Sequence, residues 1–334
     1  MAAVVCFGEL LYRLSAPDRE LLLQSPRLNA HLGGAEANVA IALAQFGHQV
    51  RMASVVSENA LGETAIGMLR RYGVDTRHVA RRSGRMGLYF LTPGAVRRPS
   101  FVLYDRAHST FVETAPESFD WRRILDGADW LHLSGVTPAL GKGPAGAAIA
   151  AAKAAQAQRV KISFDGNYRA QLWQASGGDA PTILKEVMSS ATTAFVNEKD
   201  IALILNRQFP GEESRRRAFA AAFEAFPSLE RIATTTRVEH CVDRHELTGT
   251  VVSRQGEARS KTFGLGGIVD RIGAGDAFAA GIIHGLASNR GEQYAVDFAA
   301  AAAAWKHSVL GDFLLATAPE IEAAMSGDDF SVRR

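Results

Sequence analysis

Short apolar runs of the β type alternate with longer helical stretches along most of this chain, and this alternation limits the fold more than any other feature. Such an order is typical of a parallel sheet that helices cover on both faces. Ligands of these sheets bind beyond the carboxyl ends of the strands, so we expect the functional residues there. The expected strands are 3–8, 50–56, 130–133, 160–164, 192–196 and 231–235, and the expected helices are 35–46, 61–72, 143–158, 182–190, 199–205 and 214–226.

Two stretches, 10–32 and 77–106, break this alternation. The second contains two segments of alternating hydrophobicity, 87–91 and 100–104, which are separated by turn-forming proline and glycine residues. We predict that the two stretches form a small β-sheet that projects from the core and acts as a lid. The expected division is therefore an α/β core of residues 1–9, 33–76 and 107–334 and a β-sheet lid of residues 10–32 and 77–106.

Composition narrows the class of protein. With 334 residues, of which 47% are hydrophobic, the chain can bury a large core. The net charge is +2 and the basic residues are scattered, which gives no strong field for nucleic acid or a membrane surface. The two cysteines make no disulfide framework, the first residues lack the pattern of a signal peptide, and no apolar run is long enough for a membrane span. We therefore expect a cytoplasmic enzyme that binds neither nucleic acid nor membranes.

The run 269–281 joins a turn of small residues, an isolated carboxylate and the start of a helix. Gly273, Ala274 and Gly275 carry little or no side chain, so their backbone N–H groups can close around an anion at the positive end of that helix. Asp276 is expected in the first helical turn, where it can accept a proton from a sugar hydroxyl during phosphoryl transfer. This run alone leaves a second interpretation open, a glycine-rich helix start that is capped by aspartate.

A second informative segment, 32–47, begins with a glycine pair and continues as an apolar helix. Gly33 and Gly34 allow a ligand or another backbone to approach closely. Asn38, one turn into the helix, offers donors and an acceptor for sugar hydroxyls. The alternative for this segment is a hinge followed by a polar residue at a helix start, and the presence of the 269–281 run weakens that alternative.

These two segments resemble the N-terminal and C-terminal signatures of the ribokinase family of PfkB-type carbohydrate kinases, in the order and at the spacing of that family. The resemblance covers nearly the whole chain. It implies a three-layer α/β/α core with a small β-sheet lid, and ATP-dependent phosphorylation of a sugar hydroxyl with Mg²⁺ as the divalent cation. It also implies that Asp276 is the catalytic base and that Gly273, Ala274 and Gly275 form an anion hole.

Within the family, segments 104–106, 165–169, 172–173 and 306–313 resemble the kinases of 2-keto-3-deoxygluconate, also written 2-dehydro-3-deoxygluconate. A sugar acid carries a carboxylate that neutral hexoses lack, and the planar guanidinium of arginine can bind a carboxylate through two parallel hydrogen bonds. The resemblance implies sugar-acid contacts from Gly34, Tyr89, Tyr104, Arg106 and Asp312, beside Gly33 and Asn38 of the glycine-pair segment, and it places Asn167 and Arg169 nearer the phosphates of ATP.

Three alternatives stay open at this point. For Arg106, the alternative is an exposed ion pair at the edge of the lid. For the whole chain, the alternatives are a kinase of a neutral sugar such as fructose or ribose, and a sugar-binding regulator that has lost catalysis. Asp276 and its intact turn favour an enzyme over a regulator, whereas only a comparison of substrates separates the two kinases.

The chain departs from the family pattern in the region that is expected to bind ATP. Asn197 and Asp200 resemble the two ends of the NxxE motif that helps to arrange magnesium and phosphates. Because Asp200 is one methylene shorter than glutamate, we expect it to contact Mg²⁺ indirectly, through water. Residues 234–237 stand where relatives carry a glycine-containing nucleotide loop. We therefore expect Thr235 and Arg237 to bind the phosphates through a hydroxyl and a guanidinium.

The expected lid is too thin to bury both of its faces. Phe90, Phe101 and Leu103 offer apolar surface for a partner, so we expect a homo-oligomer, a dimer or larger, that is joined through the lids. The nine histidines show no HxH or HExxH spacing, which argues against a zinc site. The expected partners are thus a sugar acid, ATP and further copies of the same chain.

Overall fold

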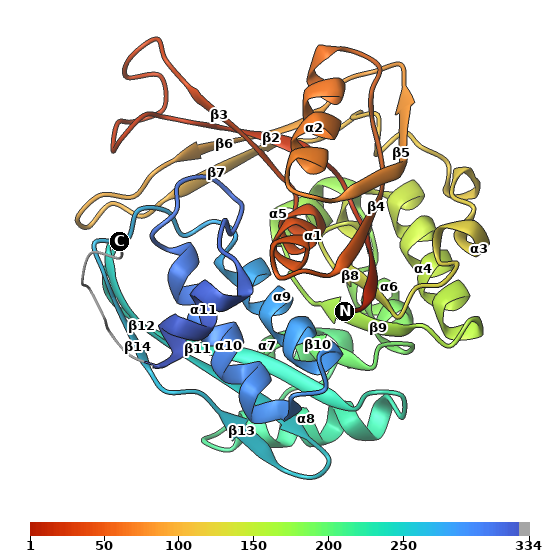
Figure 1. The fold of residues 1–334 in the computed structure, drawn as a ribbon, viewed down its shortest axis with the longest axis vertical. Coiled ribbons are helices and arrows are strands. Elements are labelled where there is room, and N and C mark those ends of the chain that lie inside the picture. Colours follow the sequence, from red (N-terminus) through yellow and green to blue (C-terminus); the bar gives the residue numbers. More distant parts are fainter. Residues whose placement is uncertain (327–334) are drawn as a thin grey trace.

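The computed structural model describes residues 1–326 and has a ten-stranded sheet at its centre (Figure 1). Its strands are β1 (Ala3–Phe7), β4 (Gln49–Ser57), β5 (Asp75–Arg82), β8 (Trp130–Ser134), β9 (Lys161–Asp165), β10 (Thr193–Phe195), β11 (Arg231–Cys241), β12 (Arg244–Ser253), β13 (Glu257–Arg259) and β14 (Phe263–Gly266). They follow the order β13-β12-β11-β10-β9-β8-β1-β4-β5, with β14 paired to β12 beside this path. Every pair from β5 to β11 is parallel, whereas β12, β13 and β14 pair in antiparallel fashion.

Each face of this sheet carries its own apolar core, because successive side chains of a strand enter opposite faces. In β1, Val4 and Cys6 belong to one core, and Val5 and Phe7 belong to the other. Helices α1 (Ala35–Gln45), α2 (Ala60–Arg71), α9 (Ala274–Ala287), α10 (Gly291–Lys306) and α11 (Ala318–Ser326) cover the first core. The second is covered by α3 (Trp121–Ile124), α4 (Lys142–Ala157), α5 (Ala170–Ser176), α6 (Ala180–Met188), α7 (Glu198–Ile204) and α8 (Ser214–Ala225), with the 3₁₀ turns η1 (Pro116–Ser118) and η2 (Pro138–Leu140) nearby.

A second, four-stranded sheet lies beside the core (Figure 1). Its strands, in the order β3-β2-β6-β7, are β3 (Asn29–Gly33), β2 (Leu11–Ser15), β6 (Gly87–Thr92) and β7 (Phe101–Asp105). Because β2 and β6 pair in parallel, two distant parts of the sequence form this one sheet. The prediction of a three-layer α/β/α core with a small second sheet is confirmed. Among residues 1–326, no helix is long and apolar enough to cross a membrane.

The junction between the two sheets differs from the expected division. Strand β5, most of which was assigned to the lid, pairs in parallel with β4 and is the edge strand of the main sheet. An edge strand and a lid strand share the same alternating pattern, so hydrophobicity alone did not separate them. Gly33, which was assigned to the core, is the last residue of β3 and pairs with Leu11.

Strand β11 extends beyond its expected end and forms a long hairpin with β12. Thr235 pairs with Gly249, and Arg237 pairs with Leu247. Residues 234–237, which were expected to replace a nucleotide loop, are therefore extended strand. The outer half of β11 carries exposed polar residues, and a strand of that kind lacks the apolar run by which a buried strand is recognised.

Candidate active site

A cavity of about 540 Å³ lies between the carboxyl ends of the central strands and the small sheet. Its core side is formed by the ends of β9 and β10, by β11 and by the first turns of α1 and α9, and its other side by β6 and β7. A parallel sheet is expected to bind ligands at this position. Of the predicted site residues, the cavity is lined by Gly34, Asn38, Tyr89, Tyr104, Arg106, Asn167, Arg169, Asn197, Asp200, Thr235, Gly273, Gly275, Asp276 and Asp312.

Asp276 lies in the first turn of α9 and faces this cavity. The pKa of its carboxyl is raised to about 8, mainly by burial and in smaller part by the neighbouring carboxylates of Asp165 and Asp312. A hydrogen bond from Asn38 acts in the opposite direction. Asp276 therefore exchanges its proton near neutral pH, as a general base for a sugar hydroxyl must.

Asn38 belongs to the first helical turns of α1 and connects that helix to Asp276. Its Nδ2 donates to Oδ2 of Asp276 at 2.6 Å. Its Oδ1 is buried and has no hydrogen-bond partner within the described part of the chain. Buried polar atoms are rarely left unpaired, so a lone acceptor beside a cavity suits a hydroxyl donor of a ligand.

The turn before α9 is shaped by Gly273, whose φ of +84° belongs to the left-handed region. A Cβ at this residue would lie 1.9 Å from the backbone oxygen of Asp312, so the turn packs directly on that backbone. At Gly275, by contrast, an added Cβ would meet no atom of residues 1–326 within 4 Å. The first amides of α9 find no acceptor within their own helix, although the N–H of Ala274 donates to the carbonyl of Arg271 at 3.4 Å.

Arg106, which follows β7, holds its guanidinium beside Glu9 at the small-sheet end of the cavity. Its Nε donates to Oε2 of Glu9 at 2.6 Å, and both side chains are buried. Ser109 also donates to the Glu9 carboxylate. Within residues 1–326 no hydrogen bond is recorded for the two terminal nitrogens of Arg106, so they are free for a planar anion. The pair is buried, unlike the exposed ion pair that was the alternative for Arg106.

Tyr89 and Tyr104 stand on neighbouring strands of the small sheet and complete this end of the cavity. Their ring centroids lie 6.4 Å apart. The hydroxyl of Tyr89 donates to Oδ2 of Asp312 at 2.7 Å. Burial raises the pKa of the Asp312 carboxyl to about 6, although its contact with Arg13 opposes this shift. The small sheet is therefore joined to the core by hydrogen bonds beside the cavity.

Asp165 ends β9 at the opposite end of the cavity, and Asn167 and Arg169 follow it in the next loop. Burial raises the pKa of Asp165 to about 7. The backbone N–H of Asn167 donates to Oδ1 of Asp165 at 3.0 Å, which fixes the loop. Arg169 is exposed and donates only to the neighbouring Tyr168 carbonyl within the described residues, so its charge is available to an anion.

Asn197 and Asp200 close the N-terminus of α7 as a capping box. Oδ1 of Asn197 accepts from the backbone N–H of Asp200 at 3.1 Å, and Oδ2 of Asp200 accepts from the N–H of Asn197 at 2.9 Å. Burial raises the pKa of Asp200, whose second oxygen has no recorded partner among the described residues. In residues 1–326 no group of three metal-ligating side chains is assembled, so a cation here needs oxygens from a ligand or from water.

Comparison with known proteins decides the family. Residues 1–313 match the pfkB family of carbohydrate kinases. The chain belongs to this family. Among curated proteins, this carbohydrate kinase is 28% identical over 333 residues to the 2-dehydro-3-deoxygalactonokinase of Haloferax volcanii, and the match covers 100% of this chain and 99% of that protein.

Solved structures agree with this assignment. The chain is similar to the crystal structure of 2-dehydro-3-deoxygluconokinase from Thermotoga maritima, with 38% identity, a TM-score of 0.92 and coverage of 98% of this chain and 100% of that one. The fructokinase of Xylella fastidiosa, whose structure contains bound ATP, shares the fold at 21% identity and a TM-score of 0.79, with coverage of 97% and 98%.

Three of the predicted site residues of this carbohydrate kinase do not line the cavity. Ala274 is buried in the first turn of α9. Gly33 packs against Asp312, whose Oδ2 would lie 2.2 Å from an added Cβ. Arg237 lies farther along β11 and lines a separate cavity between the hairpin and the small sheet. Its Nη1 lies 4.0 Å from Oε1 of Glu239.

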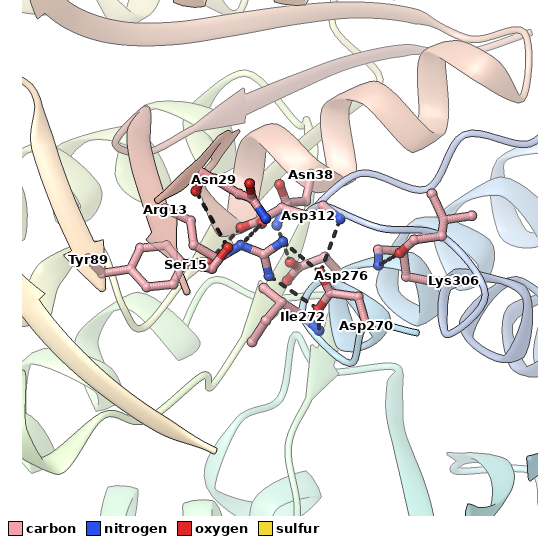
Figure 2. Close-up of polar contacts among 12 residues, drawn as sticks. Arg13, Ser15, Asn29, Asn38, Tyr89, Asp270, Ile272, Asp276, Lys306 and Asp312 are labelled. Carbon is pink, nitrogen blue, oxygen red and sulfur yellow. Dashed lines mark hydrogen bonds and ion pairs between the residues drawn. The ribbon is translucent and has the colours of Figure 1, made fainter. Parts of the chain in front are cut away.

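Arg13 and Asp270 do not line the cavity, but they contact two residues that do, Asp312 and Ile272, and the sequence did not indicate this. Figure 2 shows the guanidinium of Arg13 between the carboxylates of Asp270 and Asp312. Lys306, at the end of α10, is also fully buried near both carboxylates. In an alternating strand, a charged residue is usually interpreted as facing solvent. The only hint that Arg13 is buried was its position as a single charge within the apolar run 10–14.

Proposed function

We propose that this carbohydrate kinase transfers the γ-phosphoryl group of ATP to the terminal hydroxyl of 2-keto-3-deoxy-D-gluconate. One observation carries the proposal: a carboxyl poised near neutral pH, Asp276, and a guanidinium with free terminal nitrogens, Arg106, line the same cavity. The names of the Thermotoga and Haloferax proteins, which both specify 2-dehydro-3-deoxy sugar acids, support the same class of substrate.

In this proposal Asp276 acts as the base. Its Oδ2 is held by Asn38, which leaves Oδ1 to take the proton of the attacking hydroxyl. The hydroxyl oxygen then bonds to the γ-phosphorus, the bond from the γ-phosphorus to the bridging oxygen breaks, and ADP leaves with that oxygen. The amides of Gly273, Ala274 and Gly275 face the charge that develops on the transferred group.

Selection of a sugar acid is assigned to the small-sheet end of the cavity. The terminal nitrogens of Arg106 would bind the carboxylate of the substrate through two hydrogen bonds. Tyr89, Tyr104 and Asp312 would contact the hydroxyls. In this role the small sheet, with bounds revised to residues 10–33 and 83–106, acts as a lid that excludes water, which otherwise competes as phosphoryl acceptor.

ATP is proposed to bind at the other end of the cavity, and the structure of a fructokinase of similar fold contains bound ATP. Asn167, Arg169, Asn197 and Thr235 line this end of the cavity and offer donors to phosphate oxygens. Arg237 lies outside the cavity and would reach a phosphate only by moving its side chain. Mg²⁺, when bound, would neutralise part of the phosphate charge, and the second oxygen of Asp200 would hold it indirectly, through a water of its hydration shell.

A screen of sugars tests this function. ADP release is followed with 2-keto-3-deoxygluconate, its galactonate epimer, fructose, ribose and no sugar. We expect a specificity constant for at least one sugar acid that exceeds those of the neutral sugars roughly 10-fold or more, because a charge-assisted hydrogen bond is lost with a neutral sugar. Preference for fructose or ribose would show a neutral-sugar kinase instead, and a lack of turnover with every sugar would favour the regulator.

A further inference from the structure

Arg13 of β2 is a side chain of the small sheet that lies inside the core. Only 1% of its surface is exposed. Nη1 and Nη2 contact the two oxygens of Asp270 at 3.2 and 2.6 Å, and Nε lies 3.1 Å from Oδ1 of Asp312 (Figure 2). One guanidinium thus bridges two carboxylates that come from different loops of the core.

Asp270 also accepts hydrogen bonds from the backbone on both sides of the site. Its Oδ1 accepts from the N–H of Ile272 at 3.0 Å, directly before the Gly273 turn. Its Oδ2 accepts from the N–H of Gly311 at 3.0 Å, directly before Asp312. The carboxylate that Arg13 grips therefore holds the start of the proposed anion hole and the loop that carries Asp312.

Asp312 and the turn also touch each other. Gly273 is packed so closely on the backbone oxygen of Asp312 that a Cβ would lie 1.9 Å from that oxygen. A displacement of the Asp312 loop must therefore displace the turn. Arg13 contacts the side chain of Asp312, so its position affects the turn by this second route as well.

The charges of this group are balanced. Lys306 is fully buried, and its Nζ donates to the carbonyl of Val309 at 2.8 Å. With Arg13 it places two cations beside two buried carboxylates. Loss of one cation leaves a buried carboxylate without its counter-charge, and buried charges rearrange or take up protons when that happens.

We propose that Arg13 is a positioning residue for phosphoryl transfer, which fixes the turn of Gly273–Gly275 and the Asp312 loop in their reactive arrangement. This inference rests on the proposed function only in taking that turn as the anion hole. Arg13 belongs to the proposed lid, so closure of the lid onto the core and ordering of the anion hole are coupled. Substrate that stabilises the seated lid would thereby also order the turn.

A second lid-to-core ion pair provides a matched control. Nη2 of Arg19 lies 3.1 Å from Oδ2 of Asp243, and the two side chains are 54% and 38% exposed. Asp243 has no recorded bond to the turn or to the Asp312 loop. If Arg13 only attached the lid to the core, loss of either pair would have the same kind of effect.

The experiment compares Arg13→Lys with Arg19→Lys in the full-length enzyme. Lysine keeps the charge but cannot contact both carboxylates in the plane of a guanidinium. For Arg13→Lys we expect kcat to fall roughly 10- to 100-fold, because a small misplacement of reacting groups has effects of that size. KM for the sugar acid should rise by a smaller factor than kcat falls, because Asp312 is also a proposed sugar contact but the main loss is of transition-state stabilisation. Arg19→Lys should keep the kcat of the wild type.

Hydrogen exchange of the free enzyme gives a readout that needs no substrate. The amides of Ile272 and Gly311 are both bonded to Asp270, so they should exchange roughly 10-fold faster or more in Arg13→Lys, and at the wild-type rate in Arg19→Lys. Asp270→Asn tests the same link from the core side without altering the lid. If Arg13→Lys does not fold, Asp270→Asn provides the kinetic and exchange data.

Failure of this inference is distinct from failure of the proposed function. If the wild type phosphorylates no sugar acid while the two amides still exchange faster in Arg13→Lys, the function is wrong and the link through Asp270 stands. The positioning role is overturned if Arg13→Lys keeps the wild-type kcat and exchange rates. It is also overturned if Arg13→Lys and Arg19→Lys lose activity equally, or if KM alone changes.

Discussion

Nδ2 of Asn38 lies 2.6 Å from Oδ2 of Asp276, and this contact joins the first turns of two helices whose sequences lie far apart. The hydrogen bond fixes one oxygen of the carboxyl and leaves the other facing the cavity. It also counteracts burial, which raises the pKa of Asp276 to about 8. Asn38 therefore influences both the direction and the proton affinity of the proposed base.

Asp276→Asn should lower turnover by about 100-fold or more, since the carboxamide cannot accept the proton of the sugar hydroxyl. The substitution is nearly isosteric, so dissociation constants for sugar acid and ATP should stay close to those of the wild type. Steady-state kinetics and calorimetric titration check the two halves separately. Turnover close to that of the wild type would remove Asp276 from the role of base.

The activity of the wild type should rise with pH through about 8, because Asp276 must lose its proton to act as a base. Asn38→Ala removes the hydrogen bond that lowers this pKa, so the midpoint of kcat/KM should move to higher pH. The readout is the pH at the midpoint of the kcat/KM profile. The height of the plateau is not used, because Asn38→Ala also removes a proposed sugar contact and so lowers it. An unchanged or lower midpoint would contradict the assignment.

Arg106→Lys should weaken the choice of a sugar acid over a neutral hexose. An ammonium cannot reproduce the planar two-point contact, and loss of a charge-assisted hydrogen bond of about 1.5–3 kcal/mol lowers the specificity constant roughly 10- to 150-fold. The neutral hexose never makes this contact, so it should lose much less. If both substrates fall by the same factor, the buried pair with Glu9 is the main role of Arg106.

Gly273→Ala and Gly275→Ala separate the folding of the turn from ligand binding. At Gly273 the φ of +84° and the 1.9 Å approach to the Asp312 oxygen exclude a methyl group, so stability should fall by more than about 1 kcal/mol. At Gly275 there is room for the methyl within the protein. We expect Gly275→Ala to unfold like the wild type in urea. Its turnover should nevertheless fall by roughly 10-fold or more, because the methyl points where the phosphoryl group would approach. Wild-type turnover in that variant would contradict the proposed anion hole.

The dimer through the lids stays a prediction. Phe101 and Leu103 of β7 are 59% and 49% exposed, whereas Phe90 is half-buried. Light scattering at micromolar concentration should give at least a dimer for the wild type and a monomer for Phe101→Lys combined with Leu103→Lys. The control is Leu315→Lys, which changes an apolar residue that is 41% exposed and lies outside the small sheet. It should leave the molar mass of the oligomer unchanged. A monomeric wild type would exclude the lid interface.

Much of the fold was predictable because local patterns encode it. The central strands and helices were expected at nearly their observed bounds, since buried parallel strands and apolar helices leave strong periodic signals. The outer part of β11, residues 236–241, was missed, because Arg237 and its exposed neighbours lie in a hairpin that only its pairing with β12 explains. The same holds for β5, whose membership of the main sheet depends on a partner rather than on its own sequence.

The candidate site, like the fold, has a part that local sequence predicts and a part that depends on distant partners. The glycine turn and Asp276 could be predicted together because their chemistry lies within four consecutive residues. Glu9 and Arg13 escaped prediction because their partners lie 97 and 257 residues away. A single sequence shows that a charge interrupts an apolar strand, but it does not show which distant carboxylate or guanidinium makes its burial possible.

The parallel pairing of β2 with β6, together with the ion pair that ties β2 to Asp270, has a consequence for biosynthesis. Strand β2 leaves the ribosome before its neighbour in the sheet, β6, and well before Asp270, the carboxylate that neutralises Arg13. Until then the guanidinium stays hydrated and the strand edge stays unpaired, open to chaperones or to association with other nascent chains. Strand β2 thus reaches its native environment only after β6 and Asp270 have been made, although it precedes both in the chain.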